Sequence, residues 1–309
     1  MASGGGALAD TETSVINLNG GTITGSVFGG GAATFGGQTT VETSVITVAG
    51  ADIIGDIYGG GLAGSPRNDE ANSDYQRATS TVSDSTIKLL SGTVNGDVYA
   101  GGYVFEDQDG PEAVVTTSNI VLGSNSILTK EGAKLDGQGA GTSTLTFVTD
   151  DFDMTGKTVI GFSTVDGSAQ SVTGLVYSFG EKDTTNVLGN IAFTSVTGGD
   201  GKTMNIGTAD RTGVASIKML TDATIFNVTN GLLALNTDST DAAFSAFVGA
   251  GAQNAVYVTG TVDNTYLAGS TVKVGEVADA LNPGIYVGAN GALIADADGN
   301  TSVESLTMK

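Results

Sequence analysis

Glu12-Thr13-Ser14-Val15-Ile16 recurs letter for letter, thirty residues later, as Glu42-Thr43-Ser44-Val45-Ile46. A glycine-rich segment follows each copy: Gly25-Ser26-Val27-Phe28-Gly29-Gly30-Gly31, then Gly55-Asp56-Ile57-Tyr58-Gly59-Gly60-Gly61, then Gly96-Asp97-Val98-Tyr99-Ala100-Gly101-Gly102. A repeat of this period, made of short apolar-alternating runs and glycine corners, is the signature of a chain that coils and stacks on itself. The sequence therefore predicts an all-β fold of the parallel β-helix (β-solenoid) type.

Within each repeat, a strand signal alternates with period two. Four triplets align: Ile16-Asn17-Leu18, Ile46-Thr47-Val48, Ile87-Lys88-Leu89 and Ile120-Val121-Leu122. We expect their outer members to form two buried apolar columns and their mostly polar middle members to face solvent. A turn, at Ala49-Gly50 in the second repeat, should lead to a second strand over Ile23–Phe28, Ile53–Tyr58 and Val94–Tyr99.

Phe28, Tyr58 and Tyr99 fall at the same place in successive repeats. Aligned rings on stacked strands form either a stabilising aromatic stack or a surface ladder on which sugars bind. We favour the stabilising stack.

The repeats suggest three regions. Residues 1–11 are expected to be a flexible leader, residues 12–140 regular β-solenoid coils, and residues 141–309 an irregular continuation of the solenoid. A separate β-sandwich is the alternative for the last region, where the exact repeat fades but strand-like runs continue. One short helix is predicted over Thr240–Val248, capped by Thr240.

Composition narrows the class of protein. The 309 residues include 33 acidic and 12 basic side chains, for a formal charge of −21, so no nucleic-acid partner is expected. Cysteine is absent, which excludes disulfides and thiol chemistry and agrees with export. No run approaches eighteen apolar residues, so we expect no membrane-spanning helix. Met1–Asp10 has neither the basic nor the apolar region of a signal peptide.

Two enlarged corners are the candidate binding loops. Gly25 and Gly55 are thirty residues apart, but Gly55 and Gly96 are forty-one apart, and the excess falls within residues 64–77. Insertions in a solenoid project as loops from one face, and such loops often bind. The corner at residues 103–111 is also enlarged and acidic. The candidate binding residues are Arg67, Asn68, Asp69, Glu70, Asp74, Tyr75, Arg77, Glu106, Asp107 and Asp109.

Catalytic motifs are weak in this chain. There is no histidine, so Ser-His-Asp, Cys-His and His-metal sites are excluded. Paired carboxylates such as Asp150-Asp151 could serve a glycosidase, but solvated charge is the simpler interpretation. Asp296, Asp298 and Asn300 offer oxygen ligands at alternate positions, so calcium is the one cofactor considered, and an acidic turn is the alternative.

The glycine corners, together with the Thr-, Asn- and Gly-rich, acidic and cysteine-free composition, give the chain a family resemblance. Residues 12–140 resemble the passenger regions of Gram-negative autotransporter adhesins, through repeat style. The resemblance implies a right-handed parallel β-helix that is exported to the cell surface and mediates adhesion or aggregation.

These observations lead to one functional hypothesis and two alternatives. The hypothesis is a non-enzymatic protein, extracellular or on the bacterial cell surface, that acts by adhesion or self-association through its solenoid and projecting loops. Its expected partners are other copies of itself and a host or cell-surface protein or glycan. The alternatives are a self-assembling subunit of an extracellular filament and a polysaccharide-active β-helix enzyme.

Overall fold

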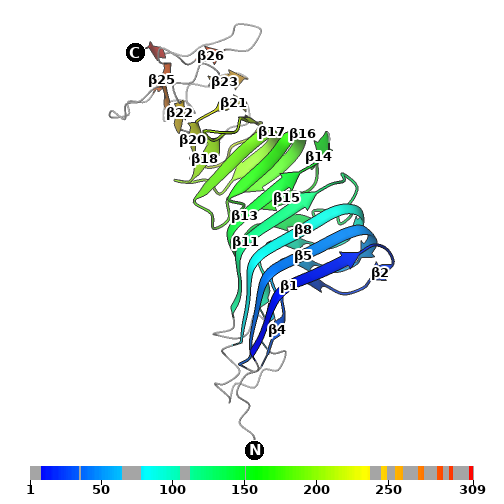
Figure 1. Cartoon of the computed structure of the whole chain (residues 1–309). Coiled ribbons are helices and arrows are strands. Elements are labelled where there is room, and N and C mark those ends of the chain that lie inside the picture. Colours follow the sequence, from blue (N-terminus) through cyan, green and yellow to red (C-terminus); the bar gives the residue numbers. More distant parts are fainter. Residues whose placement is uncertain are drawn as a thin grey trace, which may run out of the picture. The chain divides into compact units, whose positions relative to one another are not determined.

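The computed structural model describes residues 8–34, 36–64, 78–104, 112–149 and 151–236, together with the backbone of six short strands between Ser245 and Met308 (Figure 1). The chain divides into two compact units, Met1–Thr146 and Phe147–Lys309. Every described element is a strand, and the paired strands with a defined register run parallel. The predicted all-β, parallel β-helix fold is confirmed.

The first unit stacks successive coils, in which a long strand is followed by short ones. The long strands pair in the order β1–β5–β8–β11, the first short strands in the order β3–β6–β9–β12, and the second short strands form the separate sheet β4–β7–β10. The bounds are β1 Leu8–Leu18, β2 Thr22–Ile23, β3 Val27–Phe28, β4 Ala32–Ala33, β5 Gln38–Ile53, β6 Ile57–Tyr58, β7 Leu62–Ala63, β8 Thr79–Val94, β9 Val98–Tyr99, β10 Tyr103–Val104, β11 Glu112–Leu122, β12 Lys134–Asp136 and β13 Ala140–Phe147.

The predicted isoleucine column is confirmed. Ile16 pairs in register with Ile46, Ile46 with Ile87, and Ile87 with Ile120. The last three are fully buried, while Ile16, on the outermost described strand, is only half-buried. Each fully buried isoleucine contributes about 1.5–3 kcal/mol, so stacking the coils is the main source of stability.

A second interior column consists of serines. Ser44, Ser85 and Ser118 align and are buried. The Ser85 hydroxyl donates to the carbonyl of Gly59 at 3.0 Å, whereas the hydroxyls of Ser44 and Ser118 have no hydrogen-bond partner within the described residues. Ser44 and Ser85 face the glycine corners, because a Cβ atom on Gly29 would meet the Ser44 hydroxyl and a Cβ atom on Gly59 would meet the Ser85 hydroxyl.

The glycine corners are packed backbone against backbone. A Cβ atom on Gly60 would lie 2.8 Å from the Cα of Gly102 in the next coil and 2.7 Å from the side chain of Val115. A Cβ on Gly59 would lie 2.6 Å from the Ala100 carbonyl oxygen. Real Cβ atoms do not approach so closely, so glycine is needed at these corners for close contact between coils.

Three details of the first unit differ from expectation. β1 begins at Leu8, so residues 8–11, which the sequence assigned to a flexible leader, pair as strand. The predicted second strand over Ile53–Tyr58 is broken, because the chain bends between Ile53 and Ile57. The turn predicted at Ala49-Gly50 is a bulge inside β5, where Gly50 adopts a φ of 111° that a residue with a Cβ adopts rarely.

The second unit is built from shorter coils. β17 pairs with both β18 and β19, and two ladders then continue as β18–β20–β22–β24 and β19–β21–β23–β26, all parallel. The bounds are β14 Phe152–Asp153, β15 Thr158–Ile160, β16 Thr164–Ser178, β17 Thr184–Thr197, β18 Thr203–Ile206, β19 Gly213–Ile217, β20 Ile225–Val228, β21 Gly231–Asn236, β22 Ser245–Val248, β23 Ala255–Thr259, β24 Thr271–Val274, β25 Gly284–Val287, β26 Ala292–Ile294 and β27 Leu306–Met308.

The helix predicted over Thr240–Val248 is wrong where the structure describes it. Ser245–Val248 forms strand β22 and pairs with β20, Ala246 lying beside Phe226. The ladder offers each backbone group a partner in the neighbouring coil, which outweighs the weak helix preference of a short alanine- and serine-containing segment.

Large rings fill the core of the second unit. Phe162, Tyr177 and Phe226 are fully buried, and the rings of Tyr177 and Phe179 meet edge to face at 5.4 Å between centroids. The Tyr177 hydroxyl lies 3.0 Å from the Phe162 carbonyl oxygen and 2.5 Å from the Thr185 hydroxyl, so this phenol is buried with partners. Burial raises the pKa of Tyr177, so the phenol stays neutral.

Candidate functional site

All of the site residues predicted from the sequence lie outside the described residues. These are the loop residues Arg67, Asn68, Asp69, Glu70, Asp74, Tyr75, Arg77, Glu106, Asp107 and Asp109, and the calcium candidates Asp296, Asp298 and Asn300. They remain predictions. Among the residues that the structure describes, no group of three or more acidic side chains is arranged to hold a metal ion.

The aromatic column of the first unit is a stack of rings. The Phe28 and Tyr58 rings lie 4.9 Å apart with 6° between their planes, and the Tyr58 and Tyr99 rings 4.7 Å apart with 5° between them. Both faces of the Tyr58 ring are therefore covered by its neighbours. A sugar ladder needs free ring faces that point outward, so the geometry favours the stabilising stack.

An aspartate ladder follows the same corner from coil to coil. Asp56 accepts the backbone N–H of Asp97 at 2.8 Å, and Asp97 accepts the backbone N–H of Lys134 at 2.9 Å. The Lys130 ammonium adds a salt bridge to Asp97 at 2.6 Å. Burial alone would raise the pKa of Asp97, but the hydrogen bonds from Lys130 and Lys134 outweigh it and lower that pKa. These carboxylates join coils and are not free for a ligand.

The phenols beside this ladder are held neutral. The Tyr58 hydroxyl donates to Asp56 at 3.3 Å. Burial and the nearby Asp56 charge raise the pKa of Tyr58, and burial and the Asp97 charge raise the pKa of Tyr99 to about 12. With high pKa values, and with both faces of the Tyr58 ring covered, these groups act as packing and hydrogen-bonding elements.

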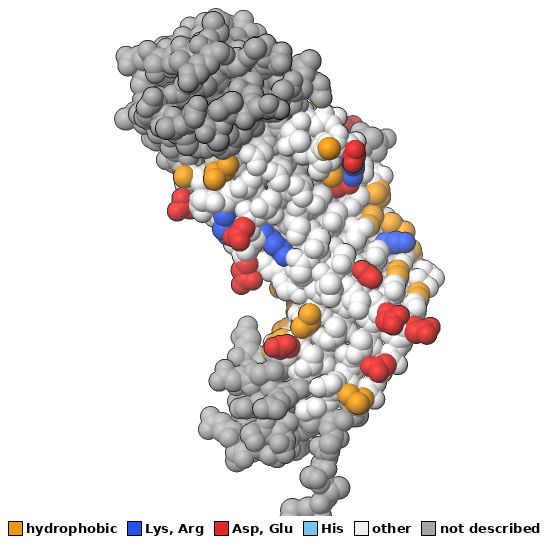
Figure 2. All heavy atoms as spheres, turned by 60° about the vertical axis from the view of Figure 1, so that its left-hand side comes forward, with side chains coloured by type: hydrophobic (Ala, Val, Ile, Leu, Met, Phe, Trp, Pro, Cys, Tyr) orange, Lys and Arg blue, Asp and Glu red, His pale blue; other side chains and the backbone are white. Residues whose placement is uncertain are grey.

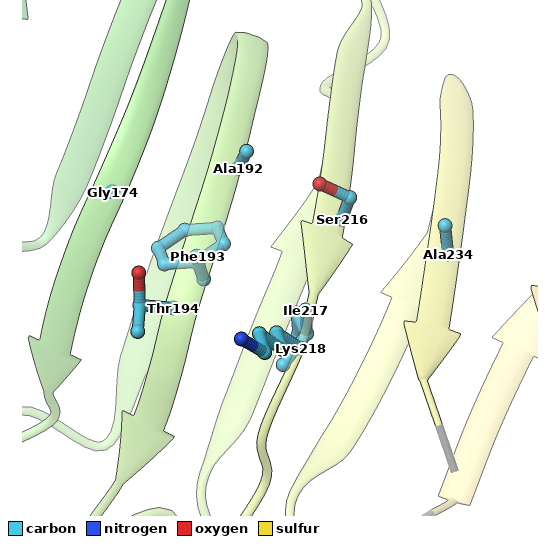
Figure 3. A pocket seen from close by; sticks show the side chains of 8 residues that line it. All are labelled: Gly174, Ala192, Phe193, Thr194, Ser216, Ile217, Lys218 and Ala234. Atoms are coloured by element: carbon cyan, nitrogen blue, oxygen red, sulfur yellow. The ribbon is translucent and has the colours of Figure 1, made fainter. Parts of the chain in front are cut away.

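The second unit carries a groove with a different character. It has a volume of about 300 Å³ and crosses β16, β17, β19 and β21 (Figure 3). Its lining residues are Gly174, Ala192, Phe193, Thr194, Ser216, Ile217, Lys218 and Ala234. The hollow arises because Ala192, Ser216 and Ala234 align in register on successive strands, so that three small side chains form one row.

Hydroxyls and one cation give the groove its chemistry. Thr194 and Lys218 are exposed, and in Figure 3 the Lys218 side chain extends toward β17, the strand that carries Thr194. Ser216 adds a second hydroxyl on the adjoining strand. The lining includes no carboxylate, so within a strongly acidic chain the groove is a local site suited to an anionic or hydroxyl-rich ligand.

A bulge near this unit's start is clamped by an arginine. Arg211 makes two hydrogen bonds to the mostly buried Asp166, at 2.6 and 2.7 Å, and Asp166 also accepts the backbone N–H of Ser168 at 2.7 Å. The hydrogen bonds that Arg211 donates to Asp166, together with the Asp166 charge, raise the pKa of Arg211 despite burial. Ser168 has a φ of 52°, a strained value for a residue with a Cβ. The clamp holds the bulge in place.

Asparagines on the outside of the second unit form another ladder. The Asn205 amide donates to Asn186 at 2.9 Å, and the Asn227 amide donates to Asn205 at 3.0 Å. These side chains are half-buried and use one another as partners. They stabilise the stacking of coils in the way that identical side chains do in other parallel stacks.

The face of the molecule drawn in Figure 2 is mostly uncharged. Backbone and uncharged polar side chains make up most of this face, and acidic and basic side chains are scattered over it (Figure 2). No helix with the length and apolar character of a membrane span occurs in the part of the chain that the structure describes.

Sequence reasoning missed the groove and the Arg211 clamp. The groove's small residues come from four strands without a repeated sequence, so their alignment depends on the register.

No family model, curated protein or solved structure matches this chain.

Proposed function

We propose that this chain is an extracellular or cell-surface protein that acts by adhesion or self-association and binds a cell-surface glycan in the groove across β16, β17, β19 and β21. The groove carries this proposal, because its lining brings two hydroxyls and a cation together in one hollow among the described residues. It crosses four strands, which at the spacing of neighbouring strands is a length of about 14 Å. A site that runs across strands suits an elongated polymer.

The ligand chemistry follows from the lining. The hydroxyls of Thr194 and Ser216 can donate to and accept from sugar hydroxyls, and the Lys218 ammonium suits a carboxylate or sulfate on the sugar. An anionic glycan is therefore the favoured class. A lining without carboxylates supports binding over glycoside cleavage, since cleavage uses two acidic groups that flank the bond.

A glycan panel and a cell-binding assay test the proposal. Ser216→Phe should fill the groove and abolish binding, and Lys218→Gln should weaken binding to anionic glycans more than to neutral ones. Lys88→Gln removes an exposed lysine from the first unit and serves as the control, with binding unchanged. Equal binding by wild type and Ser216→Phe would contradict the proposal. Release of reducing ends from the panel would support the enzyme alternative instead.

A further inference from the structure

The free edge of β1 matches an edge that the protein itself covers. β1 pairs with β5 residue for residue, and the two strands share the segment that is Glu12–Ile16 in one and Glu42–Ile46 in the other. β1 and β5 therefore carry the same local sequence. The edge of β5 that pairs with β1 is equivalent to the edge of β1 that faces away from β5. Among the described residues, β1 pairs along its length with β5 alone.

The side chains of β1 are exposed in a way their counterparts are not. Ile16 and Leu18 are half-buried, whereas Ile46 and Val48, at the same places in the next coil, are fully buried. Val15 is 58 % exposed. Core positions that remain open on an unpaired strand edge are a template for pairing with another chain.

We propose that a second copy of this chain pairs with the free edge of β1 through its own β1, antiparallel, across a two-fold axis. The same patch then serves both partners, as in an isologous dimer. A parallel continuation would need the opposite edge of a strand, and in β1 of the second copy that edge is taken by β5.

The antiparallel arrangement also keeps the exposed carboxylates of the two copies apart. Asp10 and Glu12 are exposed in the first half of β1, which begins with the exposed Leu8, and Val15, Ile16 and Leu18 lie in its second half. A parallel, in-register pair would place Glu12 against Glu12. An antiparallel pair centred near Val15 and Ile16 separates these two carboxylates by roughly 20 Å and pairs the segment that holds Val15, Ile16 and Leu18.

The backbone groups that would form the new bonds can be assigned. The Gly123 N–H donates to Leu89 of the preceding coil, and alternate residues along a strand point their N–H groups the same way. The backbone N–H of Val121 therefore points toward the preceding coil. The register gives the backbone N–H groups of Lys88, Thr47 and Asn17 the same orientation. The N–H of Asn17 points to the free edge of β1.

Sedimentation velocity over a wide range of protein concentration tests the dimer, using the full chain. Wild type should sediment as a dimer, and Asn17→Pro as a monomer, because proline removes the edge N–H and is tolerated on an edge strand. Asn17→Ala, which removes the same side chain and keeps the N–H, should remain dimeric. Circular dichroism checks that the fold is retained.

If Asn17→Pro does not fold, Val15→Lys serves as the test variant instead. Its control is Thr86→Lys, because Thr86 stands at the same register position on β8. Only Val15→Lys should yield monomers. A wild type that is monomeric at every concentration, or edge variants that dimerise like wild type, would overturn the proposal. The groove of the second unit takes no part in this interface, so glycan binding and dimerisation can each fail alone.

Discussion

The two units fill their coils in opposite ways. In the first, glycine corners bring backbones into contact and the interior is lined by aliphatic residues and serines, with Tyr58 the one buried aromatic side chain among residues 8–34, 36–64, 78–104 and 112–146. In the second, phenylalanines and Tyr177 fill the interior. The same parallel ladder can thus be held by close backbone contact or by large rings.

This difference predicts which changes each unit tolerates. A core packed by backbone contact has no room for added atoms, and a core packed by rings leaves a cavity when a ring is removed. Added volume should therefore damage the first unit, and lost volume should damage the second.

The largest expected effect is the loss of a ring from the second unit. Phe226→Ala removes a fully buried side chain and should lower the free energy of unfolding by about 3–5 kcal/mol. Phe28→Ala, which shortens the half-buried end of the aromatic stack, should cost about 0.5–1.5 kcal/mol. Denaturant unfolding followed by circular dichroism measures both. Equal losses would contradict the difference between the two cores.

An added methyl group tests the first unit. Gly60→Ala places a Cβ against the Cα of Gly102, so coils must move apart, at a cost of about 1–3 kcal/mol. The matched control is Gly20→Ala, because a Cβ at Gly20 meets nothing within 4 Å. Its unfolding free energy should stay within about 0.5 kcal/mol of wild type. If Gly60→Ala is as stable as the control, the corners are not packed as described.

The smallest effect concerns pH. The pKa of Asp97 is lowered in the folded chain, so this carboxylate adds stability above the ordinary aspartate pKa of about 4 and loses it as the pH falls through the folded value. Asp97→Asn should be less stable than wild type at neutral pH, and the gap should close in acid. The free energy of unfolding is measured against pH for both proteins. Because they differ only at residue 97, the difference between the two curves reports on Asp97 and not on the other carboxylates. A gap that stays constant down to acid pH would exclude the ladder's electrostatic role.

Sequence reasoning reached the fold because a repeat carries its own register. Ile46 and Ile87 stand at equivalent places in the repeat, and equivalent places stack. The sequence does not predict the bend between Ile53 and Ile57. The Asp56 side chain accepts a hydrogen bond from the backbone N–H of Asp97 in the next coil, and a local apolar pattern does not show this contact.

The groove could not be predicted, since Ala192, Ser216 and Ala234 are unremarkable alone and gain meaning only from parallel pairing. Strand β22 was mistaken for a helix for a related reason, because its ladder partners lie in another coil. Local pattern therefore determines the regular coils, and pairing between distant segments determines the surface of the irregular ones.

Stacking of the coils in register is the claim on which both proposals depend, and the cysteine-free sequence allows a direct measurement. Thr47 and Lys88 are register partners on adjacent coils, so their Cα atoms should lie about 5 Å apart, within the range of a disulfide. The double variant Thr47→Cys, Lys88→Cys should form an intramolecular disulfide under mild oxidation while retaining its β-rich circular dichroism spectrum. The pair Asn17→Cys, Lys88→Cys, which is separated by an intervening coil, should not. Efficient crosslinking of the second pair, or none in the first, would contradict the stacked solenoid.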